Sequence, residues 1–149
     1  RRHRRGGPLL GVREAASGQL VGAAALTLPA EPPPPPDLAG WVDGVWAELG
    51  PDAFARYQQY ASIWTALEPA PHHHLNMIGV RRSHAGRGLA RPLLEAVHAM
   101  AAADPGSSGV SLTTELPRNV SLYTHFGYRL VGQHTVAPGF ETWGFFRPK

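Results

Sequence analysis

The chain has 149 residues, of which 43% are hydrophobic and 17% are charged. This balance indicates one globular domain with a hydrophobic core and excludes an intrinsically disordered chain. The sequence contains no cysteine, which excludes disulfides, thiolate metal sites and a cysteine nucleophile. The net charge is +3, and four arginines stand within residues 1–5. The rest of the chain is therefore close to neutral, and we expect no nucleic-acid partner because the positive charge is confined to a tail.

The N-terminal segment does not resemble a targeting signal. No apolar run has the length of a membrane span, and the first arginines lead into no apolar segment with a small-residue cleavage site. We therefore expect a cytoplasmic protein with no membrane partner. The abundance of Ala, Gly, Pro and Arg is typical of a high-GC bacterial gene. We interpret residues 1–8 as a basic tail and residues 9–149 as a single domain.

Two strands and two helices are expected in the first half of the domain. Residues 9–15 and 20–28 predict strands, and Ser17 and Gly18 supply the turn of a hairpin. The five prolines of residues 32–36 indicate an extended connector, with a polyproline ligand for a partner domain as the alternative. Apolar side chains at helical spacing then predict helices over residues 38–49 and from Asp52, as a cap, to residue 67.

Strands and helices alternate in the second half. Residues 75–80 are mostly apolar, which indicates a strand in the centre of a sheet. A helix and then another strand follow it, and this order predicts that the two strands are parallel neighbours joined by a right-handed crossover. Ligand sites of such units lie at the carboxyl ends of the strands. The further elements expected are a helix over residues 89–103, a strand over 109–114, a helix over 117–126 and a final hairpin of strands 128–136 and 140–146.

The strongest motif is a glycine-rich turn at Ala85-Gly86-Arg87-Gly88-Leu89-Ala90, between an apolar strand and an apolar helix. Glycine allows a ligand to approach the backbone closely, and the first amides of a helix favour an anion such as pyrophosphate. The motif is not a P-loop, because it lacks the Gly-Lys-Ser/Thr ending. It is not the dinucleotide fingerprint either, because the third glycine is displaced and the spacing differs. A plain tight turn is the alternative.

The stretch from Ile78 to Ala90 resembles the acetyl-CoA motif of GNAT acetyltransferases, in which a strand ending in Val leads to (Gln/Arg)-Gly-x-Gly-x-(Gly/Ala). Val80, Gly86, Gly88 and Ala90 match, whereas Ala85 stands where the family has Gln or Arg. The resemblance implies an α/β fold with a central mixed, mostly antiparallel sheet flanked by helices, although the family's first strand and two helices are missing. It also implies acetyl-CoA as co-substrate, bound by Ile78, Gly79, Val80, Ala85, Gly86, Arg87, Gly88, Leu89, Ala90 and Arg91.

A second segment, residues 119–128, resembles another region of the same family. The resemblance implies that Asn119 helps to bind the cofactor arm and that Tyr123 lies near the thioester sulfur as the general acid. A tyrosine that merely packs on the sheet is the alternative for Tyr123. His73-His74-Leu75 and the helical insert before them resemble the branch that includes puromycin N-acetyltransferase.

We predict that a primary amine attacks the thioester directly. The absence of cysteine, which leaves no thiol to form an acyl-enzyme, agrees with this prediction. The resemblance to the family implies that backbone amides near Ile78 to Val80 polarise the carbonyl. Glu115, at the carboxyl end of a predicted strand, is the candidate base through a water relay, and a solvated glutamate is the alternative. His73 and His74 are further candidates for the base.

The remaining predictions concern metals and partners. We expect no metal at His72-His73-His74, because consecutive strand residues point to opposite faces. The acceptor is expected to be a small-molecule or peptide amine, and a homodimer is compatible with the sequence. A non-catalytic acyl-CoA-binding or regulatory domain of the same fold is the alternative function.

Overall fold

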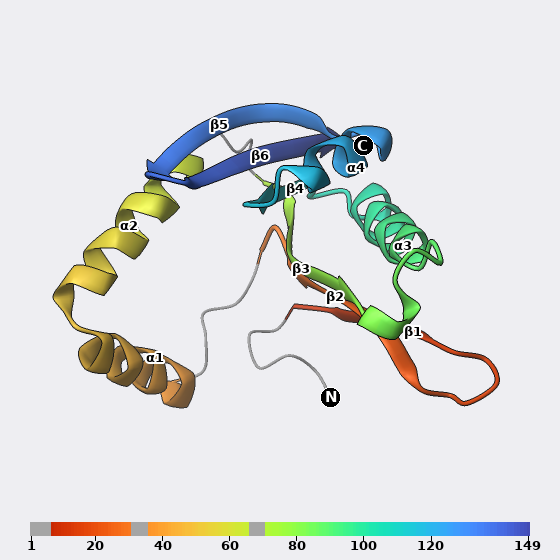
Figure 1. The fold of residues 1–149 in the computed structure, drawn as a ribbon, viewed down its shortest axis with the longest axis horizontal. Coiled ribbons are helices and arrows are strands. Elements are labelled where there is room, and N and C mark those ends of the chain that lie inside the picture. The colour runs from red at the N-terminus through yellow and green to blue at the C-terminus, as the bar shows by residue number, and fades with distance from the viewer. Residues whose placement is uncertain (1–6, 31–35, 66–70) are drawn as a thin grey trace.

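The structure is a computed structural model that describes residues 7–30, 36–65 and 71–149. Two strands come first, then two helices, and strands and helices alternate until a final hairpin (Figure 1). The elements are β1 (Leu9–Arg13), β2 (Leu20–Thr27), α1 (Pro36–Leu49), α2 (Pro51–Thr65), β3 (His73–Val80), a 3-10 turn (Arg82–His84), α3 (Ala90–Ala103), β4 (Gly109–Thr114), α4 (Arg118–His125), β5 (Arg129–Ala137) and β6 (Phe140–Pro148).

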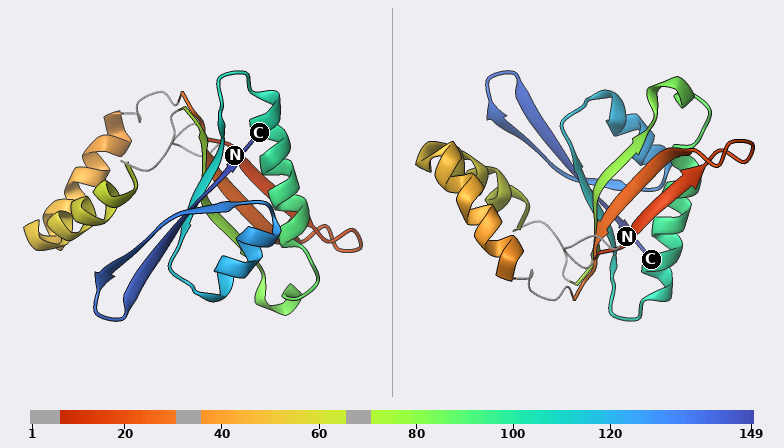
Figure 2. Two further views of the ribbon diagram at one scale, coloured as in Figure 1. Left: turned by 90° about the horizontal axis from the view of Figure 1, so that it is seen from above. Right: turned by 90° about the horizontal axis from the view of Figure 1, so that it is seen from below.

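The strands form a six-stranded sheet in the order β1-β2-β3-β4-β6-β5. β3 and β4 are parallel, and the other neighbours are antiparallel. The predicted mixed, mostly antiparallel sheet and the central position of residues 75–80 are therefore confirmed. α3 packs against β1 to β4, and α1 and α2 lie on the opposite side of the sheet from α3 (Figure 2).

The hydrophobic core lies between the sheet and α3. Leu93, Leu94, Val97 and Ala101 are the buried residues of α3, and their spacing places them on one face of the helix. Apolar side chains from the sheet and from α4 complete this core. They are Ala24, Leu26, Leu75, Val110, Leu112, Tyr123, Tyr128, Trp143 and Phe145.

Several predicted boundaries are wrong by a few residues, for local reasons. β1 ends at Arg13 because Glu14 enters the turn, where its carbonyl accepts a hydrogen bond from the Gly18 amide (2.8 Å). β3 begins at His73, before the predicted start. Pro36 belongs to α1 and not to the connector, because a missing amide donor is tolerated in the first turn of a helix. The other prolines of the connector lie outside the described residues.

α1 and α2 pack mainly on each other. Trp46 contacts Phe54 and Tyr57, with ring centroids 5.2 and 4.9 Å apart. Gly50, with φ of 83°, separates the helices, and α2 starts at Pro51, so that Asp52 lies in the first turn and is not the cap. The predicted end of this helix, after residue 65, falls outside the described residues. Among the described helices, none is long and apolar enough to cross a membrane.

Candidate active site

Strands β3 and β4 separate in the middle of the sheet. Their pairing consists of His73 opposite Val110 and His74 opposite Ser111, although β3 continues to Val80 and β4 continues to Thr114. Beyond His74, the edge of β3 that faces β4 therefore has no strand partner among the described residues. Backbone N–H and C=O groups on such an edge are available to a ligand that carries amides.

A β-bulge accounts for this separation. On the other edge of β3, Ala25 pairs with Met77 and Leu26 pairs with Leu75, so that Asn76 is an extra residue in β3. A bulge bends its strand and increases the local twist. The bulge comes directly after the last residues that pair with β4, and it turns the carboxyl half of β3 away from that strand.

The glycine-rich turn connects the end of β3 to α3. Gly86 and Gly88 have φ of 76° and 71°, a conformation that disfavours other residues. A Cβ added at either glycine would meet nothing within 4 Å, so both face open space. The amides of Gly86 to Leu89 have no hydrogen-bond partner in the described part of the chain, and no side chain caps α3. Together with the helix dipole, these amides form a site suited to an anion.

Two residues of the predicted cofactor motif are engaged within the protein. The Ala85 amide donates a hydrogen bond to the Arg82 carbonyl (3.2 Å). Arg91 lies 3.6 Å from the Glu95 carboxylate and covers the Phe126 ring, 5.2 Å from its centroid. The arginine is therefore turned toward α4, at the rim of the turn.

α4 brings the second predicted segment to the end of β4. The Asn119 side-chain amide donates a hydrogen bond to the Thr114 hydroxyl (3.1 Å). Tyr123 is 5% exposed, and its ring packs against Tyr128 and Phe145. Burial raises the pKa of the Tyr123 phenol, and the charge of Glu115 raises it further. The phenol is therefore protonated at neutral pH, as a general acid must be.

Glu115 accepts hydrogen bonds from two side chains that the sequence analysis did not single out for the site. The Tyr60 hydroxyl donates to Oε1 at 2.6 Å, and the buried Thr142 hydroxyl donates to the same oxygen at 3.2 Å. Burial, followed by the hydrogen bond to Glu115, raises the pKa of Tyr60, which keeps it a donor. α2 thus holds the candidate base in place at the end of β4. The only sequence signal for Tyr60 was its position in an apolar stripe.

The two histidines proposed as alternative bases point in different directions. His73 is 1% exposed, and its Nδ1 lies 2.9 Å from the Ser107 hydroxyl. The prediction that His73 is an alternative base is therefore wrong, because this buried ring cannot reach the amine that accepts the acetyl group. His74 is half-buried on the other face, with Nδ1 2.7 Å from the Ser111 hydroxyl. The expected alternation of these side chains is confirmed. In the ranges that the structure describes, no group of three or more His, Asp or Glu side chains is placed to hold a metal ion.

Comparison with known families identifies the fold. The family model of the acetyltransferase (GNAT) domain matches residues 54–144, more than half of the chain. The chain belongs to the GNAT acetyltransferase family. Among curated proteins, no sequence matches this GNAT chain.

Solved structures of other acetyltransferases share this GNAT fold. A polyamine N-acetyltransferase of Drosophila melanogaster is 18% identical, with a TM-score of 0.62 over 89% of this chain and 71% of that one. An acetyltransferase of Bacillus cereus is 16% identical, with a TM-score of 0.58 over 96% and 73%. Arabidopsis thaliana NAA60, solved in complex with acetyl-CoA, is 16% identical, with a TM-score of 0.53 over 92% and 71%. These similarities establish the fold.

Proposed function

We propose that this GNAT protein transfers the acetyl group of acetyl-CoA to a primary amine by direct attack. The observation that carries the proposal is the junction of two features that lack partners within the described ranges: the edge of β3 beyond His74 and the amides of Gly86 to Leu89. A strand edge suits the amides of a pantetheine arm, and the turn suits a pyrophosphate. Acetyl-CoA carries both groups and supplies an activated acetyl group as a thioester.

The residues present fit that co-substrate. In the proposed arrangement, the amides of Gly86 to Leu89 hold the pyrophosphate, and Arg87 and Arg91 add positive charge. The free edge of β3 from Ile78 to Val80 holds the arm and polarises the thioester carbonyl. Asn119 supports the arm from α4. Two glycines that face open space, together with a strand edge that has no partner in the described part of the chain, support this arrangement.

Two proton transfers accompany acetyl transfer. A C–N bond forms to the acceptor and the C–S bond of the thioester breaks, so one proton leaves the amine and one reaches the departing sulfur. Glu115, held by Tyr60 and Thr142, takes the first proton directly or through water. Tyr123, whose pKa is raised by burial, donates the second. Solvent then restores both groups, and the products are an amide and free CoA.

The proposal also covers the domain bounds, the cellular location, the branch of the family and the class of acceptor. We propose that residues 9–149 form one GNAT domain preceded by a basic tail over residues 1–8, in a cytoplasmic protein. The resemblance of residues 73–75 and of the preceding helical insert supports the puromycin N-acetyltransferase-like branch. The acceptor is a small-molecule or peptide amine.

Release of free CoA from acetyl-CoA in the presence of a panel of amines tests the proposed activity. We expect Glu115→Gln to lower kcat by about 10²-fold while leaving the affinity for acetyl-CoA unchanged. Glu48→Gln, an equal change on the exposed surface of α1, is the matched control. Binding of acetyl-CoA without turnover of any amine would favour the regulatory alternative. Wild-type kcat in Glu115→Gln would remove the base role.

A further inference from the structure

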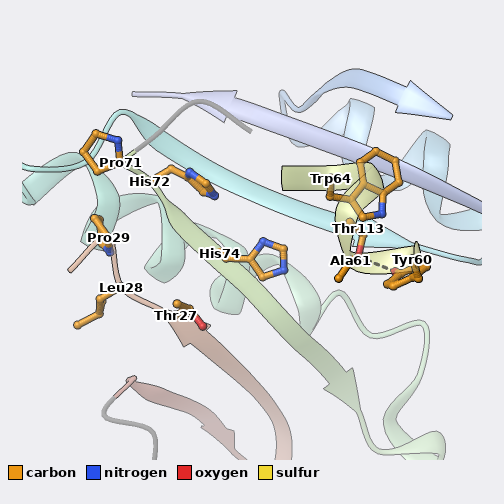
Figure 3. Close-up of a pocket in the computed structure, with 10 residues that line it drawn as sticks. All are labelled: Thr27, Leu28, Pro29, Tyr60, Ala61, Trp64, Pro71, His72, His74 and Thr113. Atoms are coloured by element: carbon orange, nitrogen blue, oxygen red, sulfur yellow. Dashed lines mark hydrogen bonds between the residues drawn. The ribbon is translucent and has the colours of Figure 1, made fainter. Parts of the chain in front are cut away.

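Two different parts of the chain hold the candidate base and the glycine-rich turn. A cavity of about 440 Å³ lies between α2 and the sheet, and the Tyr60 hydroxyl in its wall lies 3.4 Å from the Thr113 hydroxyl of β4 (Figure 3). The same Tyr60 hydroxyl donates a hydrogen bond to Glu115, so α2 fixes the candidate base. The glycine-rich turn is held from another element, the β1–β2 hairpin.

The hairpin reaches the glycine-rich turn through a contact between two side chains. His84 ends the 3-10 turn that leads to Gly86, and its Nε2 lies 3.4 Å from Oε1 of Glu14, the residue that follows β1. The His84 side chain is 12% exposed, so most of the ring is covered by protein. Among the described residues, no other side chain of residues 82–89 forms a hydrogen bond with a different element.

Glu14 is itself held in place by the hairpin turn. The Ser17 hydroxyl donates a hydrogen bond to its Oε2 (2.6 Å), and the Gln19 amide donates to that hydroxyl (3.2 Å). The bond from Ser17, followed by the bond from His84, lowers the pKa of Glu14, so the carboxylate is ionised at neutral pH and can only accept. The proton of the contact therefore lies on Nε2 of His84, and in the neutral ring Nδ1 accepts from the Ser83 hydroxyl, 2.9 Å away.

A contact at His84 matters because the residues after it are free to adopt many conformations. Gly86 and Gly88 follow at once, and glycine loses more conformational freedom on ordering than any other residue. A ligand that has to order the turn binds more weakly than a ligand that finds it already ordered. Glu14 restrains the chain two residues before Gly86, the first of the four residues whose amides lack a partner in the described part of the chain.

We propose that Glu14 and His84 are positioning residues for acetyl-CoA, because their contact holds the glycine-rich turn in the conformation that receives the pyrophosphate. The inference rests on the proposed function and adds to it a role for the β1–β2 hairpin. The charge of Glu14 by itself has the opposite effect, since a carboxylate near the turn repels an anion bound there. Arg87 of the turn is near enough for its charge to help lower the pKa of Glu14. Variants of Glu14 therefore separate positioning from repulsion by the sign of the change in affinity.

Titration calorimetry of acetyl-CoA with variants of the full chain tests the proposal. Glu14→Ala removes both the contact and the charge, and we expect the Kd to rise about fivefold, whereas loss of repulsion alone would lower it. Glu14→Gln removes the charge but keeps an oxygen that accepts from His84, so it should bind at least as tightly as the wild type. Gln19→Ala, a truncation of similar size at an exposed residue of the same hairpin, should leave the Kd within about twofold.

His84 provides a second pair of variants for the same contact. The amide of asparagine extends only as far as Nδ1, so His84→Asn should raise the Kd about fivefold. The amide of glutamine extends as far as Nε2, so His84→Gln should preserve most of the affinity. Glu14→Ala combined with His84→Asn should bind no more weakly than either single variant, because both changes break one contact. A merely structural contact would lower the free energy of unfolding in urea and leave the Kd unchanged.

NMR without ligand examines the turn directly. The amide resonances of Gly86 and Gly88 should shift in Glu14→Ala and stay in place in Gln19→Ala. If Glu14→Ala does not fold, His84→Asn takes its place in both measurements.

Three results would overturn the proposal: a Kd that is unchanged or lower in Glu14→Ala, losses that add in the double variant, and glycine resonances that do not respond. Failure of the wild type to bind acetyl-CoA would contradict the proposed function, and with it this role. Binding by the wild type with a Kd that Glu14→Ala leaves unchanged would contradict the role of the hairpin alone.

Discussion

Replacement of Gly88 by alanine tests whether the glycine-rich turn holds the pyrophosphate. Gly88 has φ of 71° and faces open space. Alanine in this left-handed conformation costs about 1–2 kcal/mol of folding free energy, but no clash adds to that cost. The strain is present with and without ligand, so it largely cancels in the dissociation constant. What remains is the effect of the new methyl group on the approach of the phosphate to the backbone.

The size of that effect follows from the contacts that would be lost. A hydrogen bond to a charged group contributes about 1.5–3 kcal/mol, and about 1.4 kcal/mol corresponds to a tenfold change in affinity. We therefore expect Gly88→Ala to raise the Kd for acetyl-CoA by about 10- to 100-fold, measured by isothermal titration calorimetry.

Gly50 provides a matched control at the junction of α1 and α2. Its φ is 83°, and a Cβ there also meets nothing within 4 Å. Gly50→Ala should lower the unfolding free energy by a similar amount and leave the Kd for acetyl-CoA unchanged. A Kd within about twofold of the wild type in Gly88→Ala, or an equal loss of affinity in Gly50→Ala, would refute the placement of the pyrophosphate.

Three further outcomes are expected. Tyr123→Phe deletes the proposed acid and should lower kcat by about 10²-fold in steady-state assays with little change in the Kd for acetyl-CoA; unchanged kcat would leave Tyr123 a packing residue. Ala85→Gln restores the residue usual in the family and should preserve or improve acetyl-CoA affinity in a titration, whereas a large loss would show that the motif is misaligned. Burial lowers the pKa of His98 to about 4 from 6.5. Between these values the unfolded chain binds more protons, so stability falls as the pH drops through this window. Urea unfolding at pH 7 and pH 5 should show this loss in the wild type and a smaller one in His98→Gln, and an equal loss in both would contradict the assignment.

The glycine positions show how much the sequence determines by local rules. Gly86, Gly88, Gly127 and Gly139 all have positive φ, where the sequence predicted tight turns or a helix end. Each depends on the conformational freedom of one residue and on its immediate neighbours. The bounds of the strand over Gly109–Thr114 and of the final hairpin also follow from local sequence, and they were predicted to within two residues.

The hydrophobic pattern also predicted the apolar helix that forms α3 and the central place of β3 in the sheet. It was less informative for α1 and α2, whose apolar stripes are only partly covered: Trp41 is 65% exposed and Tyr57 is 51% exposed. Periodicity shows which side chains share a helix face, but not what that face packs against.

Only the tertiary structure decided which residues meet at the candidate site. The hydrogen bond between Tyr60 and Glu115 joins residues 55 positions apart, and no local pattern distinguishes Tyr60 from the other aromatic residues of α2. The bulge at Asn76 depends on the register between β2 and β3. The burial of His73 likewise depends on distant neighbours, and so does the position of the Trp64 nitrogen, which has no hydrogen-bond partner among the residues described. The sequence by itself therefore determined the elements, their order and the glycine-rich turn, because these follow from local backbone preferences and periodicity. The separation of β3 from β4, the support of Glu115 and the cavity beneath α2 arise from packing between distant segments, which the tertiary structure alone defines.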